Sequence, residues 1–411
     1  MAHRALYAAF DRFPSRKGAA VHIDRFARTL FDELGGGLLY VLGGPDLPLR
    51  QIEGNVEILR FAEDVPNFLE RAMAFGARLA SVVDDHAHSL EVCHFRDPWS
   101  GVAIALRGER RYSTVFEVNA LPSVELPYLF PAVGPRTLAK IRSMEMECLA
   151  ASDVIVSPSH TTAEFLKGFG VGEAKIRVVP NGAELDSARP RPDDAPDLYI
   201  LYFGSAQTWQ GIETLLRAFA RLADFETLRL VICGSRDGKA WKPYEKLATK
   251  LGIADRIIWK FALDEEQLSR WRQHALVSIA PLTDSPRNVT QGCAPLKILE
   301  SMASGVAVVA SNLAPVRELI RDRHDGWLVH PDRPSELARA LRILLDDPDY
   351  ARQLGAEARR TIEQRFTWER SLSLLRDEYY LLSFRPRAQR GGGIPSAALS
   401  RGIPRRLRGS E

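Results

Sequence analysis

A lysine and a glutamate lie three positions apart in residues 290–311, the most informative stretch of the 411-residue chain. Pro295 suits the first turn of a helix, where its missing N–H group costs no backbone hydrogen bond. A helix over about residues 295–304 would place Lys297 and Glu300 on one face, close to the end whose free amide groups attract anions. This arrangement suits a nucleotide diphosphate, with the lysine on phosphate and the carboxylate accepting two ribose hydroxyl groups.

An exposed Glu–Lys pair on a solvated helix is the alternative interpretation of the same two residues. The surrounding sequence favours the ligand site. Gly292 permits a tight loop before the helix, and Gly305 ends the helix ahead of a buried strand predicted at residues 306–310. In parallel sheets that are covered by helices on both faces, ligands bind beyond the carboxyl ends of the strands.

Short apolar runs alternate with amphipathic helical patterns along most of the chain, which predicts parallel sheets covered by helices on both faces. A first series of strands is expected at residues 5–10, 38–42, 56–59, 90–94, 114–118, 154–157 and 176–179. A second series is expected at residues 198–203, 228–233, 256–259, 276–280, 306–310 and 326–329. The fold class is therefore α/β, with two doubly wound, Rossmann-like domains facing across a cleft.

The expected boundaries follow the restart of this pattern. The N-terminal domain is predicted over residues 1–185 and the C-terminal domain over 186–366, beginning with a linker rich in Pro, Asp and Arg. A last helix is predicted at residues 367–384. The tail at 385–411 holds seven arginines and one acid, and its composition predicts disorder. A basic tail of this kind can dock on anionic lipid or on nucleic acid, or it can simply keep the chain in solution. We expect no specific nucleic-acid partner.

Composition narrows the class of protein further. No apolar stretch reaches the length of a membrane span, and the run at residues 5–10 is too short for a secretory signal, which predicts a cytoplasmic location. The four cysteines are scattered, without a Cys-x-x-Cys pair, so zinc ribbons and redox motifs are not indicated. No acidic or His/Cys cluster requires a metal ion, and neither a metal nor a cofactor is expected.

Residues 290–311 resemble the donor-binding signature of family 4 glycosyltransferases (glycosyl transferases group 1), in which a Glu, seven residues and a second Glu precede Ala-Met-Ala-Ser-Gly-x-Pro-Val-Val. Glu300 matches the second Glu, which the family implies binds the donor ribose. Residues 178–183 (VVPNGA), 156–159 (VSPS) and the start of the second domain, LYFG…QGIETLLRAF, resemble further family stretches. The matches extend over most of residues 4–383.

The resemblance implies a GT-B fold whose last helix crosses back onto the N-terminal domain. It also implies a transfer, with retention of anomeric configuration, from a nucleotide diphosphate sugar. A UDP-linked hexose is our expectation for that donor, and the transfer is expected to be independent of metal. The acceptor, a small molecule or a glycan, is not identified by the sequence. A nucleotide-sugar 2-epimerase on the same fold and a degenerate, non-catalytic binding protein are the two alternatives.

The chain departs from the family at the donor phosphates. The first Glu of the signature falls on Gly292, which leaves its sugar contact in question. The Arg and Lys that clamp the diphosphate in the family fall on Ser205 and Gln210, which offer neutral hydrogen bonds. Lys297 is the first candidate replacement, since it lies at a helix start, and Arg287 is the second. An exposed loop residue is the alternative interpretation of Arg287.

On the N-terminal side, residues 14–22 resemble the glycine-rich loop that approaches the donor phosphates and acceptor. Gly18 allows a close approach of the backbone, and Lys17, at a glycine position of the family, offers positive charge together with Arg16. A solvated loop is the alternative interpretation.

Two further residues are candidates through the resemblance. The stretch HFRD at residues 94–97 resembles the family's His-x-His-Asp, which predicts that His94 touches the transferred sugar, unless the histidine is structural. Glu117 stands where many relatives carry a sugar-contacting His. It is expected to accept a sugar or acceptor hydroxyl group or to act as a base for the acceptor, and a surface or paired carboxylate is the alternative.

Overall fold

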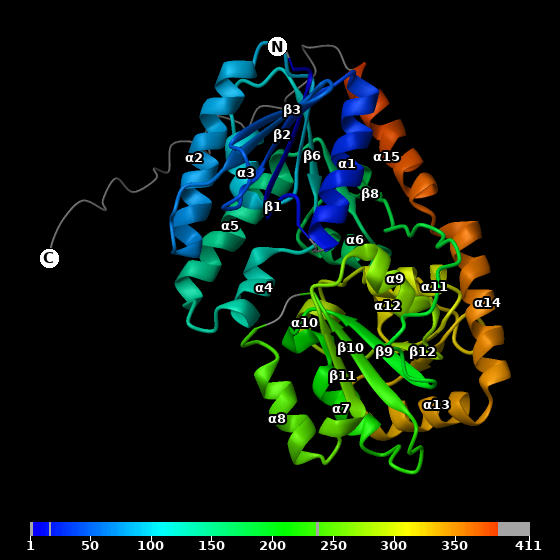
Figure 1. The fold of residues 1–411 in the computed structure, drawn as a ribbon. Helices are drawn as coiled ribbons and strands as arrows, with labels where there is room; N and C mark the ends of the chain where they lie inside the picture. The colour runs from blue at the N-terminus through cyan, green and yellow to red at the C-terminus, as the bar shows by residue number, and fades with distance from the viewer. Residues whose placement is uncertain (1–2, 16–17, 236–237, 385–411) are drawn as a thin grey trace, which may run out of the picture.

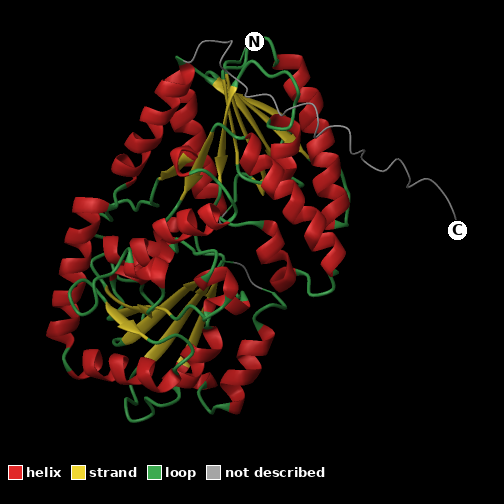
Figure 2. Cartoon of the chain, turned by 180° about the vertical axis from the view of Figure 1, so that it is seen from behind, coloured by secondary structure: helices red, strands yellow, loops and turns green. Residues whose placement is uncertain are grey.

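A computed structural model describes residues 3–15, 18–235 and 238–384 of the chain. It contains two sheets, each covered by helices on both faces (Figures 1 and 2). The predicted fold class, two doubly wound parallel-sheet domains facing across a cleft, is confirmed.

The N-terminal sheet has the strand order β3-β4-β2-β1-β5-β6-β7-β8, and all neighbours are parallel except the β3–β4 pair. Its strands are β1 Ala5–Arg12, β2 Gly37–Leu42, β3 Arg50–Glu53, β4 Val56–Phe61, β5 Val92–Phe95, β6 Ser113–Glu117, β7 Val154–Ser157 and β8 Ile176–Val178. Its helices are α1 Gly18–Leu34, α2 Phe68–His86, α3 Pro98–Ile104, α4 Pro122–Leu129, α5 Pro135–Ala151, α6 His160–Gly168 and the 3-10 turn η1 Glu173–Lys175.

The C-terminal sheet is parallel, with the order β11-β10-β9-β12-β13-β14. Its strands are β9 Tyr199–Gly204, β10 Arg229–Gly234, β11 Ile257–Phe261, β12 Val277–Ala280, β13 Ala307–Ser311 and β14 Trp327–Val329. Its helices are α7 Ile212–Phe219, α8 Lys242–Lys250, α9 Glu265–Gln273, α10 Pro286–Val289, α11 Leu296–Ala303, α12 Ala314–Arg317, α13 Pro334–Asp346 and α14 Pro348–Arg365. The 3-10 turns are η2 Thr208–Gln210 and η3 Ala254–Arg256.

Every strand expected from the sequence is present within a few residues of its predicted bounds, because each contains an apolar run. Most of these runs are buried in a parallel sheet, whereas the edge strands β8 and β11 are largely half-buried. The strand β3 was missed. It is an antiparallel edge strand whose one apolar residue, Ile52, is 54% exposed, so it carries neither a buried run nor a clear alternation.

The last helix, α15 (Trp368–Ser383), lies beside α1 of the N-terminal domain (Figure 1). Trp368, Leu375 and Tyr379 are buried in the same cluster as the inner residues of α1 and β1. The chain therefore returns from the second domain to the first, as the resemblance implied. In the part of the chain that the structure describes, no helix combines the length and apolar character needed to cross a bilayer.

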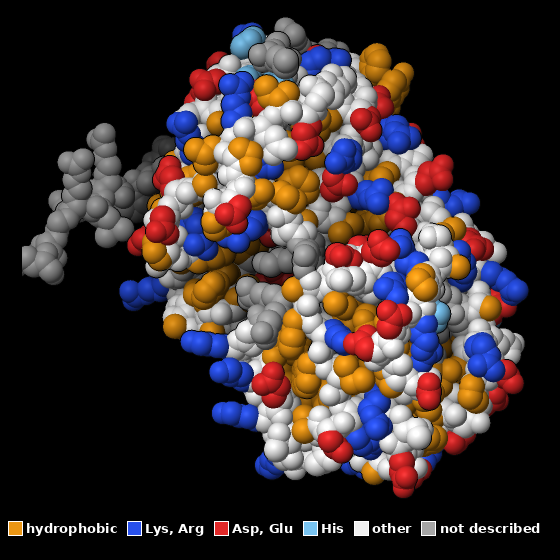
Figure 3. All heavy atoms as spheres, in the orientation of Figure 1, with side chains coloured by type: hydrophobic (Ala, Val, Ile, Leu, Met, Phe, Trp, Pro, Cys, Tyr) orange, Lys and Arg blue, Asp and Glu red, His pale blue; other side chains and the backbone are white. Residues whose placement is uncertain are grey.

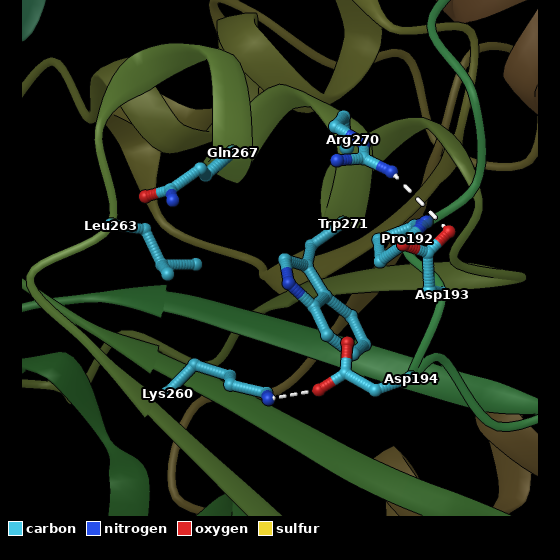
Figure 4. A pocket seen from close by; sticks show the side chains of 8 residues that line it. All are labelled: Pro192, Asp193, Asp194, Lys260, Leu263, Gln267, Arg270 and Trp271. Carbon is cyan, nitrogen blue, oxygen red and sulfur yellow. Dashed lines mark hydrogen bonds and ion pairs between the residues drawn. The ribbon is translucent and has the colours of Figure 1, made fainter.

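The linker between the sheets is held against the outer edge of the C-terminal domain (Figure 4). Asp194 pairs with Lys260 of β11, and Arg270 of α9 donates hydrogen bonds to the carbonyl groups of Pro190 and Arg191. Trp271 lies beneath these contacts, with the Lys260 ammonium 5.3 Å from its ring centre. The small hollow among these side chains is the place where the linker docks on the second domain.

Candidate functional site

The main cleft lies between the two domains and is lined by residues from both. Its walls are formed by the segments that follow β1, β5 and β6 in the first sheet and β9, β10 and β12 in the second. The carboxyl ends of both sheets therefore face the same space, which is where parallel α/β sheets bind ligands.

Lys297 lies at the second position of α11, which begins at Leu296 against a predicted start at about residue 295. Its Nζ donates a hydrogen bond to Oε1 of Gln210 at 2.6 Å and lies 4.2 Å from the ring centre of Tyr202. Gly204 has a φ of +136°, and a Cβ there would lie 2.9 Å from the ammonium nitrogen. A glycine at the end of β9 thus leaves room for the lysine head group.

The charge on Lys297 is only weakly compensated. Burial lowers its pKa to about 7, against the opposing effect of the Glu300 carboxylate. Within the described ranges it forms no ion pair, and its hydrogen-bond partner is a neutral amide. A half-buried ammonium group at a helix start, open to the cleft, is suited to receive an anion.

Glu300 lies one turn further along α11 and also lines the cleft. Burial raises its pKa to about 7, although the charge of Arg272 acts in the opposite direction. Its carboxylate accepts no hydrogen bond from any residue that the structure describes, so its oxygen atoms are available to hydroxyl groups of a ligand.

Arg272 of α9 is a cleft residue that the sequence did not reveal. Its Nη2 lies 2.8 Å from Oδ2 of Asp186 and 3.1 Å from Oε1 of Glu265, and its Nε donates to the Ser304 hydroxyl at 2.7 Å. This buried guanidinium ties α9 to the linker and to the end of α11. Of the positive charges around Glu300, that of Arg272 does most to lower the pKa of the Glu300 carboxyl group.

Two more predicted residues line the cleft. Ser205 follows β9, and its carbonyl accepts a hydrogen bond from the Tyr202 hydroxyl at 2.8 Å. Gly18 begins α1, and a Cβ there would lie 3.2 Å from Cδ1 of Leu296, so the first domain approaches the start of α11 closely at this point. Lys17, with Arg16, lies outside the described residues.

Arg287 lines the cleft but is bound to the other domain. Its Nε donates to Oε1 of Glu125 in α4 at 2.8 Å, and its guanidinium carbon lies 5.1 Å from the ring centre of Trp209. The residue is thus an interdomain contact and not the isolated loop residue considered as the alternative. Binding of phosphate at Arg287 would have to compete with Glu125.

Gly292 is buried with a φ of +87°, and it packs against the first domain. A Cβ there would lie 2.8 Å from Oγ1 of Thr162, and the residue is not part of the cleft lining. Gly292 is therefore not itself in the cleft wall, although its neighbour Cys293 is, and a longer side chain at this position would meet Thr162.

Glu117, at the end of β6, is a buried carboxylate with partners on every side. Its neighbours are the Tyr7 hydroxyl at 2.7 Å, His22 Nδ1 at 3.1 Å, His94 Nε2 at 3.2 Å, Arg96 Nε at 3.1 Å and the amide of Asn119. Burial alone would raise the pKa of Glu117, but the charge of Arg96 and the close contacts with the two histidines hold it well below its usual range. We call these six residues the Glu117 cluster.

These contacts correct the expectation that Glu117 acts as a base. A fully paired carboxylate whose pKa lies far below neutrality is a poor proton acceptor, and Glu117 does not line the cleft. His22, Arg96 and Asn119 do line it, so Glu117 positions three groups of the cleft wall. The paired carboxylate considered as the alternative is the arrangement found.

His94 is likewise enclosed by protein and absent from the cleft lining. Its Nδ1 lies 2.6 Å from the Tyr379 hydroxyl on α15, and its ring stacks on Tyr7 with centres 4.7 Å apart. Burial lowers the pKa of His94 despite the neighbouring carboxylate of Glu117. The sugar contact of His94 stays a prediction, whereas its link to the crossing helix is direct.

We predict that Glu117→Gln lowers the free energy of unfolding by about 3 kcal/mol, because Arg96 loses its buried counter-charge. Glu91→Gln is the matched control, because it breaks the more exposed ion pair between Glu91 and Arg4 at the opposite end of the same sheet. It should lower the free energy of unfolding by less than about 1 kcal/mol. Urea unfolding followed by circular dichroism measures both. Equal losses in the two variants would contradict the assigned role of Glu117.

Comparison with known proteins gives two family matches. Residues 186–361 match the model described as Glycosyl transferases group 1, and residues 16–187 match that described as Glycosyltransferase Family 4. The D-inositol 3-phosphate glycosyltransferase of Streptomyces avermitilis is 29% identical over 304 residues, which are 68% of this chain. The match spans 63% of that relative, less than two thirds of its length.

Solved structures of low sequence identity share the fold. Sucrose-phosphate synthase from Thermosynechococcus elongatus superimposes with a TM-score of 0.76 at 20% identity, covering 92% of this chain and 99% of the other. HepE from Anabaena, solved in complex with UDP-glucose, gives a TM-score of 0.70 at 16% identity, with 92% and 99% covered. The two family models together cover residues 16–361, and the chain belongs to the family 4, or group 1, glycosyltransferases with the GT-B fold.

Proposed function

We propose that the protein transfers a hexosyl group from a nucleotide diphosphate sugar, with UDP-sugar favoured, to an acceptor hydroxyl, with retention and without a metal ion. One observation carries this proposal: Lys297 and Glu300 lie one turn apart at the start of α11, both open to the interdomain cleft. The family match and the neighbour solved with UDP-glucose support the same assignment.

The chemistry requires a place for negative charge. When the sugar C1–O bond to the diphosphate breaks, the leaving phosphate gains charge, and the ammonium of Lys297 with the first amides of α11 would stabilise it. The acceptor oxygen then forms its bond to C1 on the same face, and its proton passes to the departing phosphate oxygen. The protein's main task is to hold donor and acceptor in this geometry.

The non-catalytic alternative rests on Ser205 and Gln210, which replace the cations of the family. The contact between Gln210 and Lys297 favours transfer, because it holds a cation beside the position that lost one. An assay for sugar transfer and for acceptor-free isomerisation separates the transferase from both the binding protein and the 2-epimerase.

The proposal includes a cytoplasmic location with a peripheral contact to an anionic membrane through the Arg-rich residues 385–411, which lie outside the described residues. A tail that only improves solubility is the alternative.

We predict that Glu300→Ala weakens the binding of UDP-glucose at least about 100-fold, because the ribose hydroxyls lose their carboxylate acceptor. Lys297→Ala should lower turnover about 100-fold with a smaller effect on affinity, since it removes a charge needed mainly as the phosphate leaves. Calorimetry and a donor-turnover assay measure the two effects. Lys242→Ala, at the exposed start of α8, is the control and should behave as wild type.

Full turnover in Lys297→Ala would show that the leaving group is stabilised elsewhere, and tight donor binding by Glu300→Ala would place the ribose away from α11.

The pH dependence of turnover at limiting donor concentration should identify the lysine. Above its pKa of about 7 the ammonium loses its charge, so turnover should fall as the pH rises past that value. Below a pH of about 7 the Glu300 carboxylate becomes protonated, so the pH profile should also fall on its acidic side. Lys297→Arg stays charged to a pH above about 12 and should lose the alkaline limb alone. Identical pH profiles for the two proteins would contradict this assignment.

A further inference from the structure

An aromatic surface continues the cleft on the side of the first domain. We call Phe10, Phe68, Trp99, Leu129 and Phe130 the aromatic shelf; the first four line the cleft. The Phe68 ring lies 5.5 Å from that of Phe10, 6.3 Å from Trp99 and 5.2 Å from Phe130, centre to centre. Residues from β1, α2, α3 and the end of α4 thus build one apolar wall.

The outer edge of this wall is unusually apolar. Residues 126–135, with the sequence LPYLFPAVGP, carry no charge, and Leu129 and Phe130 are 40% and 41% exposed. Hydrophobic side chains gather over α4 at the edge of the space between the domains (Figure 3). Exposed apolar surface at the mouth of a binding cleft typically marks contact with an apolar ligand or partner.

The inner edge of the shelf is polar. Arg96 and Asn119, which Glu117 holds in place, line the same cleft next to the aromatic residues. A ligand reaching from this edge to Phe130 would therefore meet hydrogen-bonding groups first and apolar side chains afterwards. Such a surface matches an amphiphile, with a hydroxylated head group and a hydrocarbon chain.

We infer that the aromatic shelf binds the apolar chain of the acceptor, so that the acceptor is a single amphiphilic molecule. This inference rests on the proposed function, because it assumes that sugar transfer takes place in this cleft. A flat bilayer or a second copy of the chain would cover Leu129 and Phe130. Phe10 and Phe68, however, are half-buried and line the cleft, a concave site that a single chain can enter and a broad surface cannot.

The experiment is saturation-transfer NMR with n-octyl β-D-glucoside below its micelle concentration, with methyl β-D-glucoside as the polar comparison. The proteins are wild type, the variant carrying Leu129→Asp and Phe130→Asp, and a control carrying Leu374→Asp and Leu381→Asp. The control positions are 50% and 60% exposed on α15, so they test the same chemical change away from the cleft.

Saturation should pass from wild type and from the control protein to the octyl chain. The Leu129/Phe130 variant should bind the octyl glucoside about tenfold more weakly. Equal binding by all three proteins, or equal signals from the two glucosides, would overturn the inference. A dimer in analytical ultracentrifugation that only the Leu129/Phe130 variant loses would also overturn it, because a second copy would then cover the shelf.

Calorimetry with UDP-glucose separates the two proposals. All three proteins should bind this donor alike. Absence of an octyl signal in wild type, with donor binding retained, would reject the shelf alone, whereas absence of donor binding in wild type would reject the proposed function.

Discussion

The cleft is organised around a half-buried ammonium group that forms no ion pair with any residue that the structure describes. Lys297 is held at the start of α11 by the Gln210 amide and the Tyr202 ring, and Gly204 leaves space for it. Burial disfavours the charged form of Lys297, and a bound anion would favour that form again. Helix start, lysine and neighbouring carboxylate are therefore best understood together, as a site for a ligand that carries both phosphate and hydroxyl groups.

The opposite wall is organised by a second buried charge, which is already satisfied. Glu117 holds His22, Arg96 and Asn119 toward the cleft, and through His94 it reaches Tyr379 on the crossing helix. The last helix of the chain is thus linked to the wall that faces the donor side. One domain offers a weakly compensated lysine and carboxylate for a donor, and the other offers a fixed surface.

The sequence allowed prediction of the parts that depend on local pattern. The buried strands and the start of α11 follow from apolar runs, glycine and proline, whereas β3 has no such run. Pairings between distant segments could not be predicted. Arg272 meets Asp186 from 86 positions away, and Glu125 meets Arg287 across 162. The partners of Glu117 come from four separate segments, so its paired state became visible only in the folded chain.

A crystal structure of the protein with UDP-glucose tests the central claim most directly. The account predicts the pyrophosphate against Lys297 and the first amides of α11, with the ribose hydroxyls on Glu300. Density for the nucleotide elsewhere in the cleft, with this end of α11 bare, would contradict it.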